Sequence, residues 1–262
     1  MSQHHPFRPK PKHDTSWNEV SSWYDQMVGE KGSDYHQNVI IPGALAMLDP
    51  QKGEKILDVA CGQGVFARRL AEKGAEVTGI DASRELIKAA ERRSPGIKFL
   101  TADATNMKVF PNESFDAVSC IMAIMNIDPL EKAIGEMARV LKEKGRMLLV
   151  LNHPAFRIPR QSGWGFDENR KLQYRRVDSY MSEMKIPIKM HPGADPRVQT
   201  LTFHRPLSSY FKGLAENGLV VDQLEEWVSH RKSIPGSSKR MEDRARNEIP
   251  LFLALEAIKL FA

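Results

Sequence analysis

One stretch near the start of the chain, ILDVACGQGVFARRLAEKGAEVTGIDAS, constrains the fold more than any other. Its first part, Lys55–Ala60, is an apolar run that predicts a strand buried on both faces of a parallel sheet. Gly62–Lys73 is predicted to be a helix that stops at Gly74, and Glu76–Ile80 a second strand. Strand, helix and strand in this order predict a right-handed crossover that joins two parallel strands.

The alternation of strands and helices continues along the chain. Further strands are predicted over residues 97–101, 115–122 and 146–151, with helices over residues 83–93 and from Asp128 to Gly145. Asp128 is expected to cap that second helix, with Pro129 in its first turn. A helix over residues 207–217 and strands over 219–227 and 249–260 follow, the two strands as an antiparallel hairpin at the sheet edge. The prediction is an α/β fold with a doubly wound, seven-stranded, mostly parallel sheet.

Three further segments organise the chain. Residues 1–15 are basic, rich in His and Pro and without periodicity, so a disordered tail is expected. Residues 16–50 are predicted to form short helices that precede the main domain, residues 51–262. An insertion at about 152–206 breaks the rhythm of that domain and is expected to cover the ligand-binding edge of the sheet.

The composition restricts where the protein is expected in the cell and which partners it can bind. No run of eighteen apolar residues suggests a transmembrane helix, and the polar start of the chain has no secretory h-region. Two cysteines suit a reducing compartment, so the cytoplasm is expected. The net charge of +5 is partly local, in the tail and over Arg231–Arg246, which keeps a nucleic-acid partner open as a less favoured alternative.

The glycine turn and its neighbouring acids restrict the ligand. In doubly wound sheets ligands bind at the carboxyl ends of the strands, where Gly62 and Gly64 permit a tight turn against a ligand. Asp81 ends the next strand, where a carboxylate can accept hydrogen bonds from a ribose diol. The same glycines satisfy a dinucleotide fingerprint, but Asp58 would repel a pyrophosphate. Asp58 suits a cationic ligand, and S-adenosylmethionine carries an ammonium and a sulfonium but no phosphate.

At this point the sequence resembles the class I (Rossmann-like) S-adenosylmethionine-dependent methyltransferases, of the ubiquinone-biosynthesis-type or methyltransferase type 11 group. The motifs that carry the resemblance are LDVACGQG, VTGIDAS, FLTADATNM, FDAVSCIMAIMNIDP and EMARVLKEKGRMLLVL. The resemblance covers about Trp17 to Leu151. One departure is Ala60, where many members have glycine. The resemblance implies methyl transfer to a small-molecule acceptor at oxygen, nitrogen or carbon, with S-adenosyl-L-methionine as the cofactor.

The resemblance also implies roles for individual residues. Asp58 would orient the methionine moiety, Asp81 would hold the ribose, and Asp103 would contact the adenine amino group. The other residues expected at the cofactor are Ala60, Cys61, Gly62, Gly64, Ala82, Ala104, Met122 and, closing over it from the N-terminal helices, Tyr35.

The acceptor side is less constrained. His153 and His204 are candidate bases, needed only if the acceptor must lose a proton. Candidate substrate-binding residues are Asn126, Phe156, Arg157 and Trp164. No His, Asp or Glu cluster has metal-ligand spacing, so no metal is expected. A tRNA or rRNA methyltransferase and a non-catalytic cofactor-binding subunit stay open as alternatives, and the chain is expected to be a monomer or homodimer.

Overall fold

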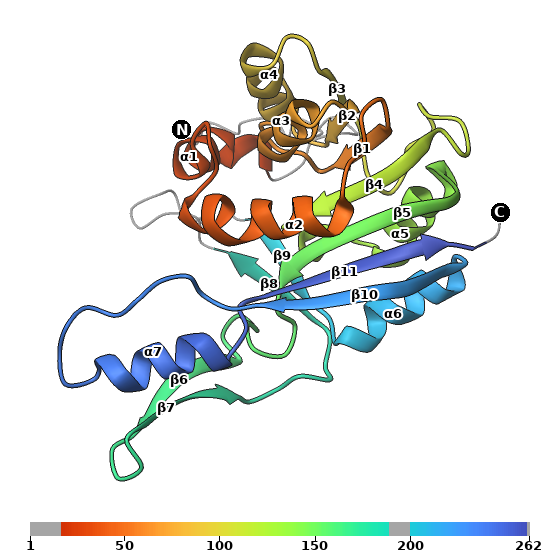
Figure 1. The fold of residues 1–262 in the computed structure, drawn as a ribbon. Helices are drawn as coiled ribbons and strands as arrows, with labels where there is room; N and C mark the ends of the chain where they lie inside the picture. The colour runs from red at the N-terminus through yellow and green to blue at the C-terminus, as the bar shows by residue number, and fades with distance from the viewer. Residues whose placement is uncertain (1–16, 189–199, 261–262) are drawn as a thin grey trace, which may run out of the picture.

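The computed structural model describes residues 17–188 and 200–260, and its centre is a seven-stranded sheet (Figure 1). The strand order is β10-β11-β5-β4-β1-β2-β3. The parallel strands are β1 (Lys55–Val59), β2 (Glu76–Asp81), β3 (Lys98–Thr101), β4 (Phe115–Ile121) and β5 (Leu141–Asn152). In the sheet, β2 lies on one side of β1 and β4 lies on the other. The strand order therefore reverses beside β1. The predicted doubly wound sheet is confirmed.

The last two strands complete the sheet at one edge. β11 (Phe252–Lys259) runs antiparallel to both β5 and β10 (Leu219–Trp227), which confirms the predicted hairpin. The connection between them contains α7 (Lys239–Glu248), a helix that the sequence pattern does not predict. Only Ala245 of this helix is buried, so the segment has almost no apolar face from which to predict it.

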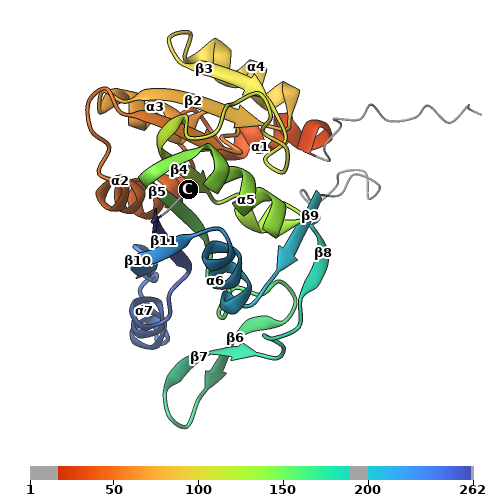
Figure 2. The same cartoon turned by 90° about the vertical axis from the view of Figure 1, so that its right-hand side faces the viewer.

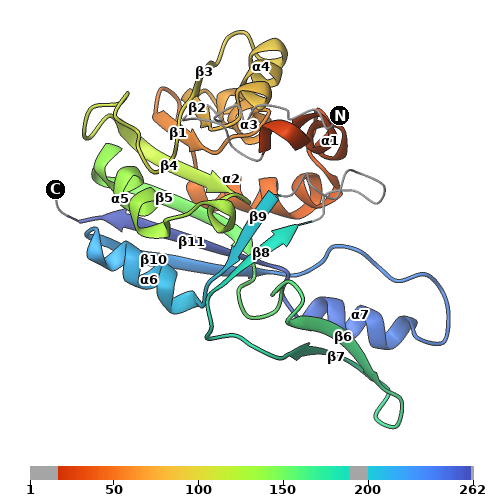
Figure 3. The same cartoon turned by 180° about the vertical axis from the view of Figure 1, so that it is seen from behind.

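Helices cover both faces of the sheet because neighbouring residues of a buried strand point to opposite sides. Ile56 of β1 packs with α2 (Ile41–Leu48), α3 (Val65–Glu72) and α4 (Arg84–Arg93). Leu57, the next residue, packs with α5 (Leu130–Val140) and α6 (Leu207–Glu216). Figure 3 shows α5 and α6 on the face that is hidden in Figure 1. The double burial explains why the parallel strands are apolar at successive positions.

The N-terminal region forms α1 (Trp17–Val28), the π-helical turn η1 (His36–Ile40) and then α2. α1 packs against α4, beyond the carboxyl ends of the central strands. The tail predicted over residues 1–15 lies outside the described residues. No helix in the described parts of the chain is both long and apolar enough to cross a membrane.

The insertion consists of two hairpins with different neighbours. β6 (Ser162–Asp167) and β7 (Leu172–Val177) lie beside α7, at the end of the molecule far from α3 and α4 (Figures 1 and 2). β8 (Met184–Ile188) and β9 (Thr200–His204) lie beside the 3-10 turn η2 (Ile124–Asn126), where Thr202 Oγ1 donates to the Met125 carbonyl at 3.3 Å. Only the second hairpin therefore borders the carboxyl end of β4.

The predicted cap of α5 is wrong. α5 begins at Leu130, its N-cap residue is Pro129, and no side chain caps it. Asp128 instead accepts a hydrogen bond from Arg205 Nη2 at 2.7 Å. The helix ends at Val140 rather than at Gly145, because Leu141 already pairs with Phe115 and begins β5.

Candidate functional site

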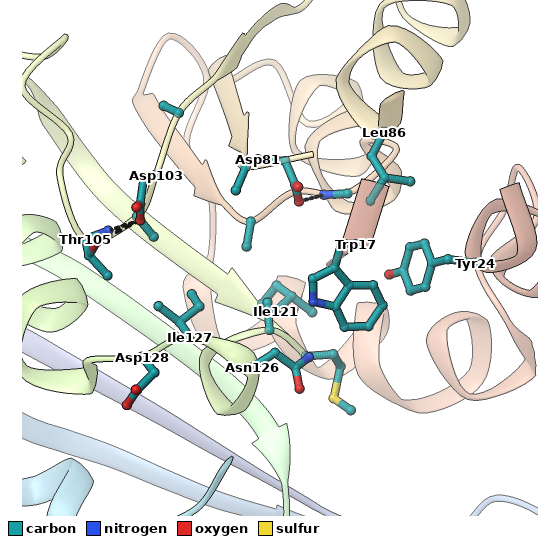
Figure 4. Close-up of a pocket in the computed structure, with 17 residues that line it drawn as sticks. Trp17, Tyr24, Asp81, Leu86, Asp103, Thr105, Ile121, Asn126, Ile127 and Asp128 are labelled. Carbon is teal, nitrogen blue, oxygen red and sulfur yellow. Dashed lines mark hydrogen bonds between the residues drawn. The ribbon is translucent and has the colours of Figure 1, made fainter. Parts of the chain in front are cut away.

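A cavity of about 250 Å³ lies at the carboxyl ends of β1, β2 and β4. Each of the turns that follow the first four strands contributes to its wall (Figure 4). The wall brings together seven of the residues expected at a cofactor, namely Ala60, Gly62, Asp81, Ala82, Asp103, Ala104 and Met122. Asn126, expected at the substrate, also lines it. The cavity therefore lies where the strand order reverses, as the topology predicts.

Asp81 is tied to the glycine turn by its own carboxylate. Oδ2 accepts from the Gly62 backbone amide at 2.9 Å, and Oδ1 accepts from the Ser83 amide at 2.7 Å. Burial raises the pKa of Asp81 to about 6, although the Ser83 and Gly62 amides act to lower it. A carboxylate has about four lone-pair positions. The two that these amides leave unused can accept hydroxyl donors from the cavity.

The backbone of the turn requires both glycines. Gly62 has φ of +56° and Gly64 has φ of +81°, the left-handed region that other residues rarely adopt. A Cβ on Gly64 would lie 2.9 Å from the Phe99 ring. These angles also delay the predicted helix, so α3 begins at Val65 rather than at Gly62. Gly64 shapes the turn but does not line the cavity.

Asp58 lies deeper, at a second cavity of about 30 Å³. This inner cavity shares Tyr24, Ala60 and Ile121 with the large one and is also lined by Cys61. Asp58 Oδ1 accepts from Ser119 Oγ at 2.9 Å, whereas Oδ2 is buried and has no hydrogen-bond partner among the described residues. Burial raises the pKa of Asp58 to about 7, although the Ser119 hydroxyl and the nearby Ala67 backbone amide act to lower it. An unpaired buried oxygen is costly, so this position is suited to a donor that arrives with a ligand.

Asp103 is exposed at the mouth of the large cavity. Its Oδ1 accepts from both the backbone amide and Oγ1 of Thr105 at 2.8 Å, which fixes the carboxylate in a turn (Figure 4). The other oxygen is not used by these two bonds. Ala82 and Ala104 line the same cavity.

Two aromatic residues of α1 close the cavity. Trp17 and Tyr24 both line it, and their rings pack edge to face with centroids 5.6 Å apart (Figure 4). The sequence analysis expected Tyr35 here. Its hydroxyl instead bonds Ser229 Oγ at 3.0 Å and its ring packs on Phe252, so Tyr35 lines neither cavity. The spacing of seven residues between Trp17 and Tyr24, two helical turns, was a usable signal for a shared face.

The two candidate bases do not line the large cavity. His153 Nδ1 accepts from the Ala155 amide at 3.2 Å, and Nε2 lies 2.7 Å from Glu226 Oε1. Burial lowers the pKa of His153, with Glu226 opposing the shift. His204 Nε2 lies 2.7 Å from the Tyr180 carbonyl oxygen. Both rings are therefore held by structural partners.

Three other residues expected at the substrate also lie away from the large cavity. Phe156 stacks on the His153 ring with centroids 4.7 Å apart, and the Arg157 guanidinium lies 5.3 Å above the Phe252 ring. Trp164 is exposed on the β6–β7 hairpin, under the Arg175 guanidinium. No group of three His, Cys, Asp or Glu side chains within the described ranges is arranged to hold a metal ion.

Comparisons with known proteins agree with this geometry. A family model described as a methyltransferase domain matches residues 57–149. A demethylmenaquinone methyltransferase of Paenarthrobacter aurescens is 28% identical over 209 residues, which cover 77% of this chain and 81% of the relative. Another, from Renibacterium salmoninarum, is 37% identical over 105 residues, and the chain spans less than half of that relative, 44%.

Solved structures give the same result over most of the chain. A putative S-adenosylmethionine-dependent methyltransferase from Listeria monocytogenes superposes with a TM-score of 0.64 and 25% identity, covering 83% of this chain and 98% of the other. An S-adenosylmethionine-dependent methyltransferase from Mesorhizobium loti has a TM-score of 0.66 and 24% identity, covering 83% and 96%. The likeness to the Mesorhizobium loti structure, at this identity, supports the fold.

Proposed function

Because the chain is a class I S-adenosylmethionine-dependent methyltransferase, we propose that it transfers a methyl group from S-adenosyl-L-methionine to a small-molecule acceptor and releases S-adenosylhomocysteine. The observation that carries the proposal is the unpaired Oδ2 of Asp58, buried at the inner cavity next to the large cavity that Gly62 and Asp81 line. A ligand with an ammonium at one end and a ribose in the middle supplies the hydrogen-bond donors that the carboxylate oxygens of Asp58 and Asp81 lack.

Each acid of the site has a distinct task in this proposal. Asp58 binds the ammonium in the inner cavity, and ionises as it does so because an opposite charge favours its charged form. Asp81 accepts hydrogen bonds from the two ribose hydroxyls, using the lone pairs that the Gly62 and Ser83 amides leave free. Asp103 accepts a hydrogen bond from the adenine amino group at the mouth of the large cavity. Trp17 and Tyr24 of α1 cover the large cavity and exclude water from it. When bound, the cofactor supplies an electrophilic methyl group on its sulfonium.

The chain's own contribution to the reaction is positioning. A nucleophile held in line with the methyl carbon gains most of its rate from orientation and from loss of solvent. The segment after β4, which includes Asn126 and Asp128, lines the cavity on the side opposite Asp81 and is the proposed contact with the acceptor (Figure 4). The relatives named above act on demethylmenaquinone by name, which favours a small organic acceptor here. We assign no base role to His153 or His204, whose rings are held elsewhere.

Calorimetric titration of the protein with S-adenosylmethionine, S-adenosylhomocysteine and NADH in parallel tests the proposal. Binding of the two adenosyl ligands, lost in Asp81→Ala, is the expected result. Binding of NADH alone would overturn the methyltransferase function. Retention on bulk RNA at low salt, measured on the same preparation, would instead favour the RNA methyltransferase alternative.

We also propose a cytoplasmic location, supported by Cys61 and Cys120, which are free thiols in the structure. Free thiols suit a reducing compartment. The expected monomer or homodimer is measured by light scattering of the purified chain.

A further inference from the structure

A third cavity, of about 30 Å³, lies at the same edge of the sheet, on the other side of η2 from the proposed cofactor site. It is enclosed by η2, the end of β5 and β9, and its polar wall consists of Asn152, Arg157, Thr202, His204, Arg205 and Tyr210. We call it the Arg205 cavity. Nothing in the proposed handling of the cofactor uses it.

Arg205 is buried at this cavity and is only partly paired. Its side chain is 5% exposed. Nη2 donates to Asp128 Oδ1 at 2.7 Å and to the Ile127 carbonyl at 3.1 Å. Nη1 is buried and makes no hydrogen bond of good geometry with the described residues, although the guanidinium lies near the Tyr210 hydroxyl and 4.9 Å from the Phe203 ring. Because an unmade hydrogen bond from a buried charged group is expensive, the cavity is missing an acceptor for Nη1.

The cavity carries more positive than negative charge. Arg157 also lines it, and the contact that the structure records for its guanidinium is the Phe252 ring at 5.3 Å, with no carboxylate of the described chain paired to it. Asp128, the carboxylate paired with Arg205, is 52% exposed and so shares its charge with water. Two arginines thus line the cavity, with one partly solvated counter-charge.

A second unpaired group supports the same ligand. Asn152 Oδ1 at the end of β5 is buried without a partner. The oxygen and nitrogen of an asparagine amide are interchangeable by a rotation, so Asn152 can present its NH₂ to the cavity as a donor. Arg205 Nη1 and the Asn152 amide, from two residues that line the cavity, would then be two donors available to a ligand there. A single water could take these bonds, but it would leave the excess positive charge in place.

We propose that the Arg205 cavity binds the carboxylate of the methyl acceptor. A carboxylate matches the planar donors of arginine better than any neutral group of its size. Arg205 also links the cavity to the reaction centre, because it holds Ile127 and Asp128, which line the large cavity. An acceptor anchored here would extend past η2 toward the methyl group. The inference rests on the proposed methyl transfer, and it specifies the acceptor as a carboxylic acid.

Benzoate and its neutral isostere benzamide serve as probes, titrated by NMR on the arginine Nε–H signals with and without saturating S-adenosylhomocysteine. We expect benzoate to shift the Arg205 and Arg157 signals and to bind about tenfold or more tightly than benzamide, the ratio that one charge-assisted bond supplies. Arg157→Met should lower benzoate affinity about tenfold. Arg176→Met, a surface arginine with 63% side-chain exposure, is the matched control and should change nothing.

Two outcomes overturn the inference. One is equal binding of benzoate and benzamide, and the other is unchanged benzoate affinity in Arg157→Met. Arg205→Lys adds a second check if Arg157→Met folds poorly, since it keeps the charge but loses the paired donors. The adenosyl titration separates this inference from the proposed function: absent S-adenosylhomocysteine binding would refute the function, whereas the benzoate preference is measured without the nucleoside as well.

Discussion

The backbone amide of Gly62 donates a hydrogen bond of 2.9 Å to Oδ2 of Asp81, so the turn after β1 and the acid that ends β2 form one unit. Two residues nineteen positions apart in the chain therefore fix each other's place. The bond orients the Asp81 carboxylate and leaves lone pairs for the cavity. Gly62 and Asp81 therefore form a single binding edge of the large cavity.

Asp81→Asn should weaken S-adenosylhomocysteine binding by about 100-fold, since two hydrogen bonds from ribose to a charged acceptor lose about 3 kcal/mol together. Asn keeps the volume of the side chain but can accept from only one of the Gly62 and Ser83 amides, so circular dichroism must show that the fold is retained. Isothermal titration calorimetry measures the affinity. Glu76→Gln, on the same strand but exposed at its far end, is the control. Affinity within threefold of the parent in Asp81→Asn would show that the ribose lies elsewhere.

Asp58 should make cofactor affinity depend on pH. Burial raises its pKa to about 7, and only the ionised carboxylate attracts an ammonium. Affinity for S-adenosylhomocysteine should therefore fall as the pH drops from 8 to 6, with proton release on binding near neutral pH. Calorimetry in buffers of different ionisation enthalpy measures that release. The Asp58→Asn variant should bind S-adenosylhomocysteine weakly at every pH, and its affinity should no longer change near pH 7.

The same group should make the free protein less stable at higher pH. A folded-state pKa of about 7 against an ordinary 3.8 means that folding takes up a proton between these values. Stability from this group is thus greatest below about pH 4 and is lost as the pH rises toward 7, by at most about 4 kcal/mol. Asp58→Asn keeps an oxygen for Ser119 and should melt higher than the parent at pH 8. A lower melting temperature there would contradict the assignment of an uncompensated buried charge.

The sheet and the acids at its edge could be predicted because their chemistry is local. A strand buried on both faces, such as Lys55–Val59, must be apolar at successive positions, and a turn with positive φ must use Gly62 and Gly64. Asp58 and Asp81 follow from the strand ends that carry them. The placement of these parts needed only the sequence spacing and the rule for parallel crossovers.

Side chains outside the strands could not be placed in the same way. Tyr35 and Tyr24 are both aromatic residues of the N-terminal region, yet only Tyr24 points into the cavity, because α1 packs on α4 and η1 packs near β11. His153 follows β5 as expected, but Glu226 on β10 holds its ring. Such contacts join residues far apart in the chain, seventy-three positions in the case of His153 and Glu226, and no local pattern in one sequence encodes them.

Trp17→Ala should weaken S-adenosylhomocysteine binding about tenfold, because the indole lines the large cavity and packs on Tyr24. Loss of a large aromatic surface that covers a ligand costs on the order of 1 to 2 kcal/mol. Trp164→Ala is the matched control, since Trp164 is exposed on the β6–β7 hairpin. Titration of both variants measures the difference. Equal affinities would remove α1 from the site.

His153→Gln should change how stability depends on pH. Burial lowers the pKa of His153 in the folded state, so the unfolded chain takes up the proton first as the pH falls below about 6.5. The parent should lose stability between about pH 6.5 and 5, and His153→Gln should lose less. Melting curves over this range test the prediction. His36→Gln is a useful comparison, because burial lowers the pKa of His36 in the same direction. An identical slope in parent and His153→Gln would contradict it.

Gly64→Ala should destabilise the fold more than Gly62→Ala. A methyl group on Gly64 would meet the buried Phe99 ring at 2.9 Å, and its φ of +81° adds backbone strain. Strain of about 1 kcal/mol and overpacking of about 1 to 3 kcal/mol predict a loss of about 2 to 4 kcal/mol. On Gly62 the methyl would lie 3.4 Å from Tyr24, an ordinary contact, so only the strain remains.

Chemical denaturation of the two variants measures this order. Gly96→Ala is the control, because nothing lies within 4 Å of its added methyl. A Gly64→Ala protein as stable as Gly96→Ala would mean that Phe99 can move aside at no cost. The turn after β1 would then not depend on the close packing of Gly64 against β3, and its rigidity would have to come from the Gly62–Asp81 hydrogen bond alone.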